Sequence, residues 1–249
     1  MYLIGDIGNT EIKLCILNNK LKKKRKIYIK TNLVNEKYLK KKLSFLKPLL
    51  KNFKYVLFCS VVPKIYKMFK KFFKFKLNLP CYELKELNLK SLVKILVNRK
   101  QVGSDRLSNA ISVIDYNNNY IIVDLGTATT FDVIKKKEYL GGIIAPGPIL
   151  SLENLIKKAS LIPKVKLKKM TNIIGKNTSS SVKSGFYWGY VGLIDNIVNL
   201  IIKNTRSKYK IIFTGGLADM FKNSLKHKSK VSKDITLNGL IKVINCKII

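Results

Sequence analysis

The chain has 249 residues, of which 47% are hydrophobic, enough to bury a core in one large domain or in two lobes. No apolar run approaches the ~20 residues that a membrane-spanning helix needs, and the N-terminus lacks the basic segment of a signal peptide. The four cysteines are scattered without C-x-x-C spacing: Cys15, Cys59, Cys81 and Cys246. We therefore expect a globular, cytoplasmic protein without a membrane partner, whose cysteines are small buried hydrophobic residues.

The formal net charge of +35 comes almost entirely from lysine. Lysine is in excess along the whole sequence, with clusters at Lys20–Lys26 and Lys37–Lys42. A nucleic-acid interface would gather such residues on one face, whereas an excess spread over every surface indicates compositional drift. We expect no specific nucleic-acid partner, although non-specific binding at low salt follows from the charge alone.

The first predicted element is a hairpin at the N-terminus. An apolar strand, Tyr2–Gly5, leads into Asp6–Thr10 (DIGNT), and a second apolar strand follows at Ile12–Leu17. A glycine in such a turn lets backbone N–H groups approach an anion closely, and hydroxyl groups add donors. Because an Asp would repel a phosphate, Asp124, which ends the strand of the second such hairpin described below, is better suited to holding a cation that bridges to one. Lys13, on the return strand, can reach a phosphate as a point charge.

Strands and helices alternate up to about residue 115. The expected elements are a strand at Lys26–Thr31, a helix at Asn35–Lys51 with a break near Pro48, a strand at Tyr55–Val62, a helix at Lys64–Phe75 and a short strand at Pro80–Glu83. A polar turn, Gln101–Arg106, then opens a helix from Asp105 to Asp115. We expect Ser104 to be its N-cap, and Asp105 lies in the first turn, where the helix dipole favours an anion.

A second hairpin with the same Asp-x-Gly turn is predicted at Tyr120–Asp132 (YIIVDLGTATTFD). The run Ile121–Val123 predicts a buried strand that ends in Asp124, with Gly126 and Thr127 in the turn before a return strand. One Asp-Gly hairpin is a commonplace turn. Two copies about half a chain apart predict two related lobes that offer their hairpins to a shared nucleotide cleft. We expect these lobes at residues 1–115 and 116–249.

The remaining elements follow in chain order. We expect a strand at Tyr139–Gly147, a helix at Pro148–Ser160, an irregular basic segment at Leu161–Ser180, a long helix at Ser181–Asn204, a strand at Lys210–Gly216 and a last helix at Asp234–Ile244. The long helix carries Gly185, Gly189 and Gly192 beside aromatic residues. Glycine weakens a helix, so close packing must compensate, either in the core or at a subunit interface.

Carboxylates are the candidate acid–base groups. His227 is the only histidine and lies in a lysine-rich stretch, which argues against a Ser-His-Asp triad or a histidine metal site. Four of the scarce acidic residues stand in or beside glycine-containing turns: Asp6, Asp105, Asp124 and Asp132. Each has an alternative as a cap or turn residue. A phosphoryl transfer would use the two hairpins for nucleotide phosphates and one carboxylate, predicted to be Asp105, for the proton of the attacking hydroxyl.

A series of short motifs runs through nearly the whole chain: DIGNTEIK (Asp6–Lys13), SVVP (Ser60–Pro63), GSDR (Gly103–Arg106), DLGTATTFD (Asp124–Asp132), GGIIAPG (Gly141–Gly147), GKNT (Gly175–Thr178), SG (Ser184–Gly185), TGG (Thr214–Gly216) and DITLNGL (Asp234–Leu240). In this order they resemble the type III pantothenate kinases, of the acetate-and-sugar-kinase, Hsp70 and actin superfamily. The first hairpin alone is common to the superfamily, whereas the third, fourth and fifth motifs together are specific to the family.

The resemblance implies an α/β, two-lobed actin-like ATPase fold with duplicated ribonuclease-H-like lobes and a nucleotide cleft between them, in a homodimer. It implies ATP-dependent phosphorylation of pantothenate to 4′-phosphopantothenate, with Mg²⁺ and a monovalent cation, K⁺ or NH₄⁺. By similarity, ATP would be bound by Asp6, Ile7, Gly8, Asn9, Thr10, Glu11, Ile12, Lys13 and Thr127. Pantothenate would be bound by Gly103, Ser104, Asp105, Arg106 and Thr178, with Asp105 as the proton acceptor. Asp124 would hold the monovalent cation.

One segment departs from the family pattern. Ahead of GSDR the family carries Tyr-x-Asn-Pro, whose Tyr contacts pantothenate, but this chain has Leu96 and Arg99 at the ends of that motif. The missing hydroxyl removes one hydrogen bond, worth about 0.5–1.5 kcal/mol of pantothenate binding. The departure leaves open another small acceptor alcohol.

A second hypothesis keeps the fold but makes the chain a catalytically weak accessory or regulatory protein associated with nucleic acid. The retention of Lys13, Asp105 and Asp124 favours the kinase, because a binding module has no need of all three.

Overall fold

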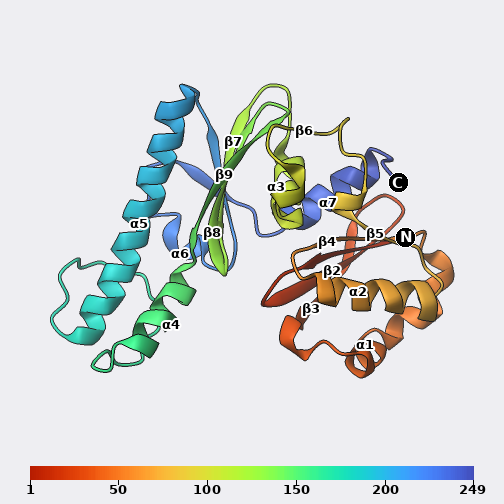
Figure 1. Ribbon diagram of the computed structural model, residues 1–249, viewed down its shortest axis with the longest axis horizontal. Helices are drawn as coiled ribbons and strands as arrows, with labels where there is room; N and C mark the ends of the chain where they lie inside the picture. Colours follow the sequence, from red (N-terminus) through yellow and green to blue (C-terminus); the bar gives the residue numbers. More distant parts are fainter. The chain divides into compact units, whose positions relative to one another are not determined.

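The computed structural model describes residues 1–249, which form two compact units. The first unit contains residues 1–114 and 234–249, and the second contains residues 115–233 (Figure 1). The lobes expected at 1–115 and 116–249 differ from these units in the last segment. That segment returns to the first unit because α7 (Ile235–Asn245) packs against α3 (Ser104–Val113).

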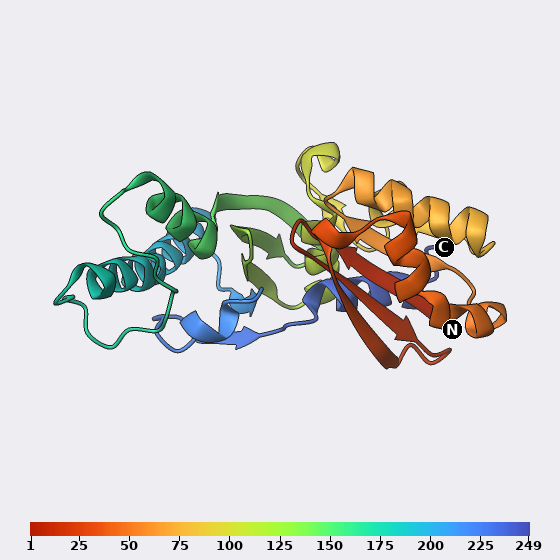
Figure 2. The ribbon, with the colours of Figure 1, turned by 90° about the horizontal axis from the view of Figure 1, so that it is seen from below.

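The first unit is built on a mixed sheet in the order β3-β2-β1-β4-β5. Its strands are β1 (Tyr2–Ile7), β2 (Glu11–Leu17), β3 (Lys23–Lys30), β4 (Val56–Ser60) and β5 (Cys81–Glu83). Strand β2 is antiparallel to β1 and β3, β4 is parallel to β1, and β5 is parallel to β4. The antiparallel part is the red ribbon of Figure 2. The predicted N-terminal hairpin is therefore confirmed as the β1–β2 connection.

Helices cover both faces of this sheet. Helices α1 (Glu36–Lys42) and α2 (Pro63–Lys71) lie on one face, and α3 and α7 lie on the other (Figure 1). Under α2, the rings of Phe58 and Phe69 are buried with their centroids 5.3 Å apart. The shorter elements are η1 (Thr31–Leu33), η2 (Ser44–Asn52), η3 (Phe72–Lys76), η4 (Leu84–Glu86), β6 (Lys94–Ile95) and η5 (Arg99–Gln101).

The helix expected at Asn35–Lys51 is divided. Its α-helical part ends at Lys42, and Ser44–Asn52 forms a 3₁₀ helix that contains Pro48. Proline has no N–H for an α-helical hydrogen bond, so the break falls earlier and more completely than the sequence indicates.

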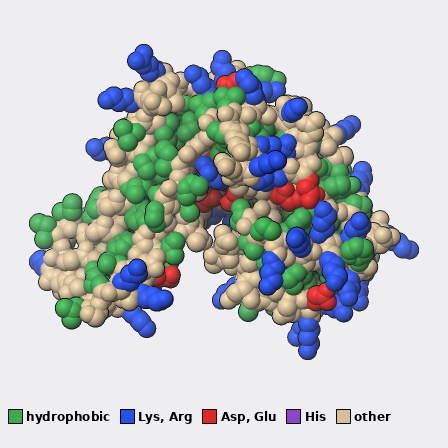
Figure 3. Space-filling model, viewed as in Figure 1, with side chains coloured by type: hydrophobic (Ala, Val, Ile, Leu, Met, Phe, Trp, Pro, Cys, Tyr) green, Lys and Arg blue, Asp and Glu red, His purple; other side chains and the backbone are tan.

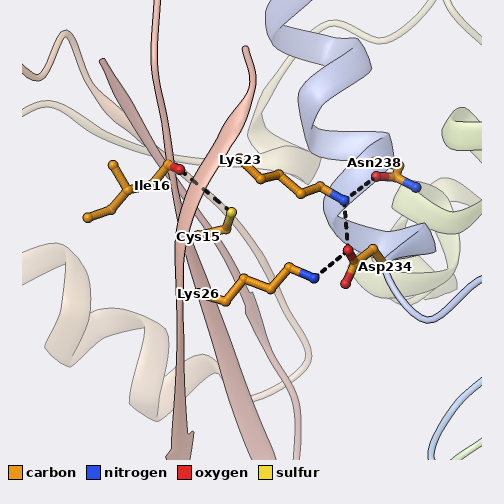
Figure 4. A network of polar contacts seen from close by, with 6 residues as sticks. All are labelled: Cys15, Ile16, Lys23, Lys26, Asp234 and Asn238. Atoms are coloured by element: carbon orange, nitrogen blue, oxygen red, sulfur yellow. Dashed lines mark hydrogen bonds and ion pairs between the residues drawn. The ribbon is translucent and has the colours of Figure 1, made fainter.

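A polar network joins α7 to β3 within the first unit (Figure 4). Lys23 Nζ donates to Asp234 Oδ2 at 2.8 Å and to Asn238 Oδ1 at 2.7 Å, and Lys26 Nζ donates to Asp234 Oδ2 at 2.5 Å. Partial burial opposes ionisation of Asp234, but the two lysine hydrogen bonds outweigh it and lower the pKa of this carboxyl. The network fixes the start of the last helix against the sheet.

The second unit repeats the topology of the first. Its strands are β7 (Asn119–Leu125), β8 (Ala128–Lys135), β9 (Glu138–Pro146), β10 (Lys210–Thr214) and β11 (Ser229–Val231). They lie in the order β9-β8-β7-β10-β11, with β7-β8-β9 antiparallel and β7-β10-β11 parallel. These five of the six strands in the sheet match β3-β2-β1-β4-β5 one for one, so the predicted duplication of ribonuclease-H-like lobes is confirmed.

Three helices cover one face of the second sheet: α4 (Pro148–Lys158), α5 (Thr178–Thr205) and α6 (Ala218–Phe221). Helix α5 has 28 residues and a mean hydropathy of 1.2 over its most apolar window, so by length and composition it meets the criterion for a membrane span. The expectation that no segment would do so is wrong. Core helices pass the same test, and Tyr187, Ile194 and Val198 of α5 are buried in the core of this unit.

The glycines of α5 lie on its exposed face. A Cβ placed on Gly185, Gly189 or Gly192 would meet nothing within 4 Å. The interpretation of these glycines as a tight core contact is therefore wrong, because the chain itself places nothing against them.

Candidate active site

The turn between β1 and β2 presents polar groups at the end of the first sheet. The Gly8 N–H donates to the Glu11 carbonyl oxygen at 3.1 Å, and Thr31 Oγ1 donates to the Gly8 carbonyl oxygen at 2.8 Å. These bonds leave Asn9 and Thr10 exposed at the tip. Asp6 and Lys13, one pair behind Ile7 and Ile12, face each other in the register of the two strands.

A buried thiol connects this hairpin to α3. Cys59 lies beside Asp6 in the β1–β4 pair, and its Sγ is 3.6 Å from Asp6 Oδ1. Burial raises the pKa of the Cys59 thiol well above its ordinary value, and the negative charges of Asp6, Asp105 and Glu83 raise it further. Three carboxyl groups from β1, β5 and α3 thus gather around one neutral side chain.

Asp105 sits in the first turn of α3, where the sequence predicted it. Its Oδ1 accepts a hydrogen bond from the Arg106 N–H at 2.7 Å. A Cβ on Gly103 would overlap this same oxygen, so a larger residue there would displace the carboxylate. The expectation that Ser104 caps the helix is wrong: Gly103 is the N-cap residue, and Ser104 is the first helical residue.

Burial raises the pKa of the Asp105 carboxyl above its ordinary value. The hydrogen bond from Arg106 and the positive charges of Arg106 and Lys85 act in the opposite direction. A buried carboxyl group with a raised pKa, placed in a glycine-containing turn, is a candidate proton acceptor.

Three separate segments of the second unit meet around the β7–β8 turn. The Gly126 N–H donates to the Ala128 carbonyl oxygen at 3.1 Å, and the Gly147 N–H donates to the Thr127 carbonyl oxygen at 3.1 Å. Gly147 has no room for a Cβ, because that atom would overlap the carbonyl oxygens of Gly126 and Thr127. The GGIIAPG motif therefore ends in a glycine because its backbone lies against the DLGT turn.

Asp124 lies at the end of β7 against a glycine with a positive φ. Gly215 has a φ of +88°, and a Cβ there would lie 2.6 Å from Asp124 Oδ1 and from the Leu125 carbonyl oxygen. Gly215 of the TGG motif thus lets the backbone lie close to the Asp124 carboxylate.

The residues predicted to bind pantothenate fall in both units. Gly103–Arg106 belong to the first unit, whereas Thr178 is the exposed first residue of α5 in the second. Asn177 caps α5 by accepting a hydrogen bond from the Ser180 N–H at 2.9 Å. Neither unit alone contains the whole predicted set.

Sequence reasoning missed Cys59 and Glu83. Cys59 is a small buried residue, as the sequence predicts, but its contact with Asp6 depends on the β1–β4 pairing. The one usable signal for Glu83 is that a scarce acidic residue ends a short predicted strand.

Comparison with known proteins identifies the family. A family model described as type III pantothenate kinase matches residues 2–200. A type III pantothenate kinase from Pelagibacter ubique (strain HTCC1062) is 54% identical over 242 residues, covering 97% of this chain and 98% of that protein.

Solved structures share the fold. A Baf family transcriptional activator from Campylobacter jejuni has a TM-score of 0.63 at 18% identity, covering 98% of both chains. An N-acetylglucosamine kinase from Porphyromonas gingivalis has a TM-score of 0.53 at 14% identity, covering 100% of both chains. These likenesses, with the two duplicated sheets, confirm the predicted two-lobed actin-like ATPase fold. On the family model and the Pelagibacter relative, the chain belongs to the type III pantothenate kinase family of phosphotransferases.

Proposed function

We propose that this chain transfers the γ-phosphoryl group of ATP to the hydroxyl group of pantothenate, giving ADP and 4′-phosphopantothenate, the first step toward coenzyme A. The family supports the substrate. The observation that carries the chemistry is the Asp105 carboxyl, which lies at the start of α3 with a raised pKa and a hydrogen bond from Arg106.

Asp105 acts as the general base. It takes the proton of the attacking hydroxyl while that oxygen bonds to the γ-phosphorus and the bond from this phosphorus to the bridging oxygen of ADP breaks. The raised pKa makes Asp105 a better proton acceptor than an exposed Asp. Arg106 keeps a positive charge beside it, and its guanidinium can fork onto the carboxylate of pantothenate.

The β1–β2 hairpin, Asp6–Lys13, binds the phosphates of ATP, and Thr127 also contacts ATP. The exposed amide and hydroxyl of Asn9 and Thr10 and the charge of Lys13 suit a polyphosphate. The Asp6 carboxylate offers the oxygen ligand that Mg²⁺ takes together with phosphate oxygens. When bound, Mg²⁺ neutralises negative charge on the transferring phosphoryl group.

Asp124 holds the monovalent cation, K⁺ or NH₄⁺. Its Oδ1 and the Leu125 carbonyl oxygen both face the Cα of Gly215, so two oxygen donors lie together where a side chain would exclude an ion. Carboxylate and carbonyl oxygens are the donors that hard cations accept, and carbonyl oxygens replace the hydration shell of K⁺.

The protein works as a homodimer through the exposed face of α5, under this proposal. That face carries Gly185, Gly189 and Gly192, and Leu200 is 54% exposed. The Trp188 Nε1 donor is buried without a partner. Gly192→Lys would then convert the dimer to a monomer in light scattering, whereas a wild-type monomer would contradict this part.

The proposal includes a cytoplasmic location, where ATP is available, and no membrane or specific nucleic-acid partner. Lysine and arginine side chains are scattered over the face of both units seen in Figure 3, interspersed with apolar and neutral surface. This dispersal supports compositional drift over a built nucleic-acid interface. The accessory-protein hypothesis is not favoured by the family match.

The test is ATP turnover with pantothenate as acceptor, in Mg²⁺, with K⁺ replaced by Na⁺ in parallel. Wild type should form ADP only with pantothenate and faster in K⁺. Asp105→Asn should lower kcat by about 10²–10⁴-fold, the range for loss of a general base, with ATP affinity and any DNA affinity unchanged. Asp219→Asn, at an exposed carboxylate, is the matched control. No turnover by wild type at saturating pantothenate would overturn the proposal.

A further inference from the structure

Glu83 is a buried carboxylate that the proposed reaction does not use. It is the last residue of β5 and only 8% exposed. Burial raises the pKa of the Glu83 carboxyl, while hydrogen bonds from Ser104, Lys85 and Ser60 oppose the shift. Burying a carboxyl group destabilises the fold unless its oxygens accept hydrogen bonds. These three hydrogen bonds therefore explain how the fold tolerates a buried Glu83.

Each of these hydrogen bonds comes from a different segment of the site. Oε2 accepts from the Lys85 N–H at 2.6 Å, just after β5. Oε1 accepts from the Ser60 N–H at 3.3 Å, at the end of β4, and from the Ser104 hydroxyl at the start of α3. One carboxylate therefore joins the ends of two strands to the first residue of the helix that carries Asp105.

The Ser104 hydroxyl is used in the hydrogen bond to Glu83. Its side chain is 1% exposed, and the N-terminus of α3 has no side-chain cap hydrogen bond. The orientation of the first helical turn therefore depends on a tertiary bond to Glu83 where a local cap would ordinarily serve.

We infer that Glu83 is a positioning residue that holds Asp105 in place through Ser104, with Ser60 fixing the other side of the carboxylate. This inference rests on the proposed role of Asp105 as the base. Asp105 directly follows Ser104, so a shift of Ser104 moves the carboxylate relative to the acceptor hydroxyl. A displacement of about 1 Å in a reacting geometry can cost about 10²-fold in rate.

The test compares four variants by kcat and by the KM values for ATP and pantothenate. Glu83→Ala and Ser104→Ala should each lower kcat by about tenfold or more with the KM for ATP unchanged. Glu83→Gln keeps an acceptor oxygen for Ser104 and should restore most of kcat. Glu86→Ala is the matched control, because Glu86 lies three positions on and its carboxylate forms an exposed ion pair with Lys70.

A double variant separates positioning from independent roles. If Glu83 and Ser104 act as one unit, Glu83→Ala with Ser104→Ala should lower kcat no more than Glu83→Ala alone. Additive losses, or a Ser104→Ala effect confined to the KM for pantothenate, would overturn the inference and assign Ser104 to direct substrate binding.

Amide hydrogen exchange provides a readout that does not need turnover. In Glu83→Ala, the peptide that contains Asp105–Leu107 should exchange faster while peptides of β7 and β8 in the second unit do not change. Unchanged exchange and unchanged kcat would overturn the positioning role. A wild-type protein that fails to phosphorylate pantothenate would instead overturn the proposed function, and faster exchange in the variant would still establish the structural link.

Discussion

Gly239 of α7 lies directly against the main chain of Ser108 in α3, so closely that a Cβ on Gly239 would overlap the Ser108 carbonyl oxygen. Two hydrogen bonds secure the same contact: Ser108 Oγ donates to the Thr236 carbonyl oxygen at 2.7 Å, and Thr236 Oγ1 donates to Asn109 Oδ1 at 2.8 Å. The DITLNGL motif therefore serves as the support of the helix that carries Asp105, and its glycine is needed for the close crossing of the two helices.

Gly239→Ala should destabilise the protein, because the overlapping atom is main chain and cannot rotate away. Overpacking of this kind costs about 1–3 kcal/mol in the free energy of unfolding, which urea denaturation measures. Gly216→Ala is the control, because a Cβ there meets nothing within 4 Å. Equal stabilities of the two variants would contradict the close crossing.

Asp105→Asn should be more stable than wild type at neutral pH, although the proposed role of Asp105 predicts a loss of activity. The raised pKa means that the folded state binds this proton more tightly than the unfolded chain does. Stability from the group is therefore present below the ordinary Asp pKa and is lost as pH rises through the raised value. The advantage of the variant should shrink in acid. Asp219→Asn, where two lysines lower the pKa, should show no gain at neutral pH.

Lys85→Met should move the acidic limb of the kcat/KM profile to higher pH. The positive charge of Lys85 lowers the pKa of Asp105, so its removal leaves more of the base protonated at a given pH. The hydrogen bond from the Lys85 backbone N–H to Glu83 is retained in this variant. Lys90→Met, at an exposed lysine, is the control, and an unmoved limb in Lys85→Met would show that Asp105 is not the titrating base.

Gly215→Ala should weaken activation by K⁺. The new Cβ would lie 2.6 Å from Asp124 Oδ1, and a positive φ costs a non-glycine residue about 1–2 kcal/mol. The K⁺ concentration for half-maximal rate should rise, while Gly216→Ala, where a Cβ meets nothing, should match wild type. An unchanged K⁺ dependence in Gly215→Ala would contradict the role of Asp124.

Leu96→Tyr should lower the KM for pantothenate without changing kcat. Leu96 is 49% exposed, so the larger ring has room, and one restored hydrogen bond is worth about 0.5–1.5 kcal/mol, or roughly 2- to 12-fold in KM. Val97→Tyr, at a neighbouring side chain that is 39% exposed, controls for the added ring. No difference between the two would indicate that the acceptor does not approach this segment.

Local patterns explain what could be predicted from the sequence. Both hairpins are short apolar runs that end in Asp-x-Gly, and Asp105 stands in a polar turn ahead of a helix, so each is visible within a dozen residues. The start of α5 was missed because its capping box pairs Asn177 with Ser180 in place of the usual Glu or Gln.

Long-range contacts explain the rest. The Ser104 hydroxyl donates a hydrogen bond to Glu83, 21 residues earlier. A serine with every local property of an N-cap therefore forms a tertiary contact in place of a helix cap. The return of α7 to the first unit depends on its packing against α3 around Gly239. No change in amino-acid composition along the sequence indicates this packing.

The division of the first unit between residues 1–114 and 234–249 has a consequence for protein synthesis. Domains fold as they leave the ribosome, at about 5–20 residues per second, with the N-terminal domain usually first. Here the second unit, which is continuous in sequence, can fold while the first unit still lacks α7. The helix that carries Asp105 receives its partner only after translation has passed Asp234, so a nascent chain contains both Asp-x-Gly hairpins before α7 supports the helix of Asp105.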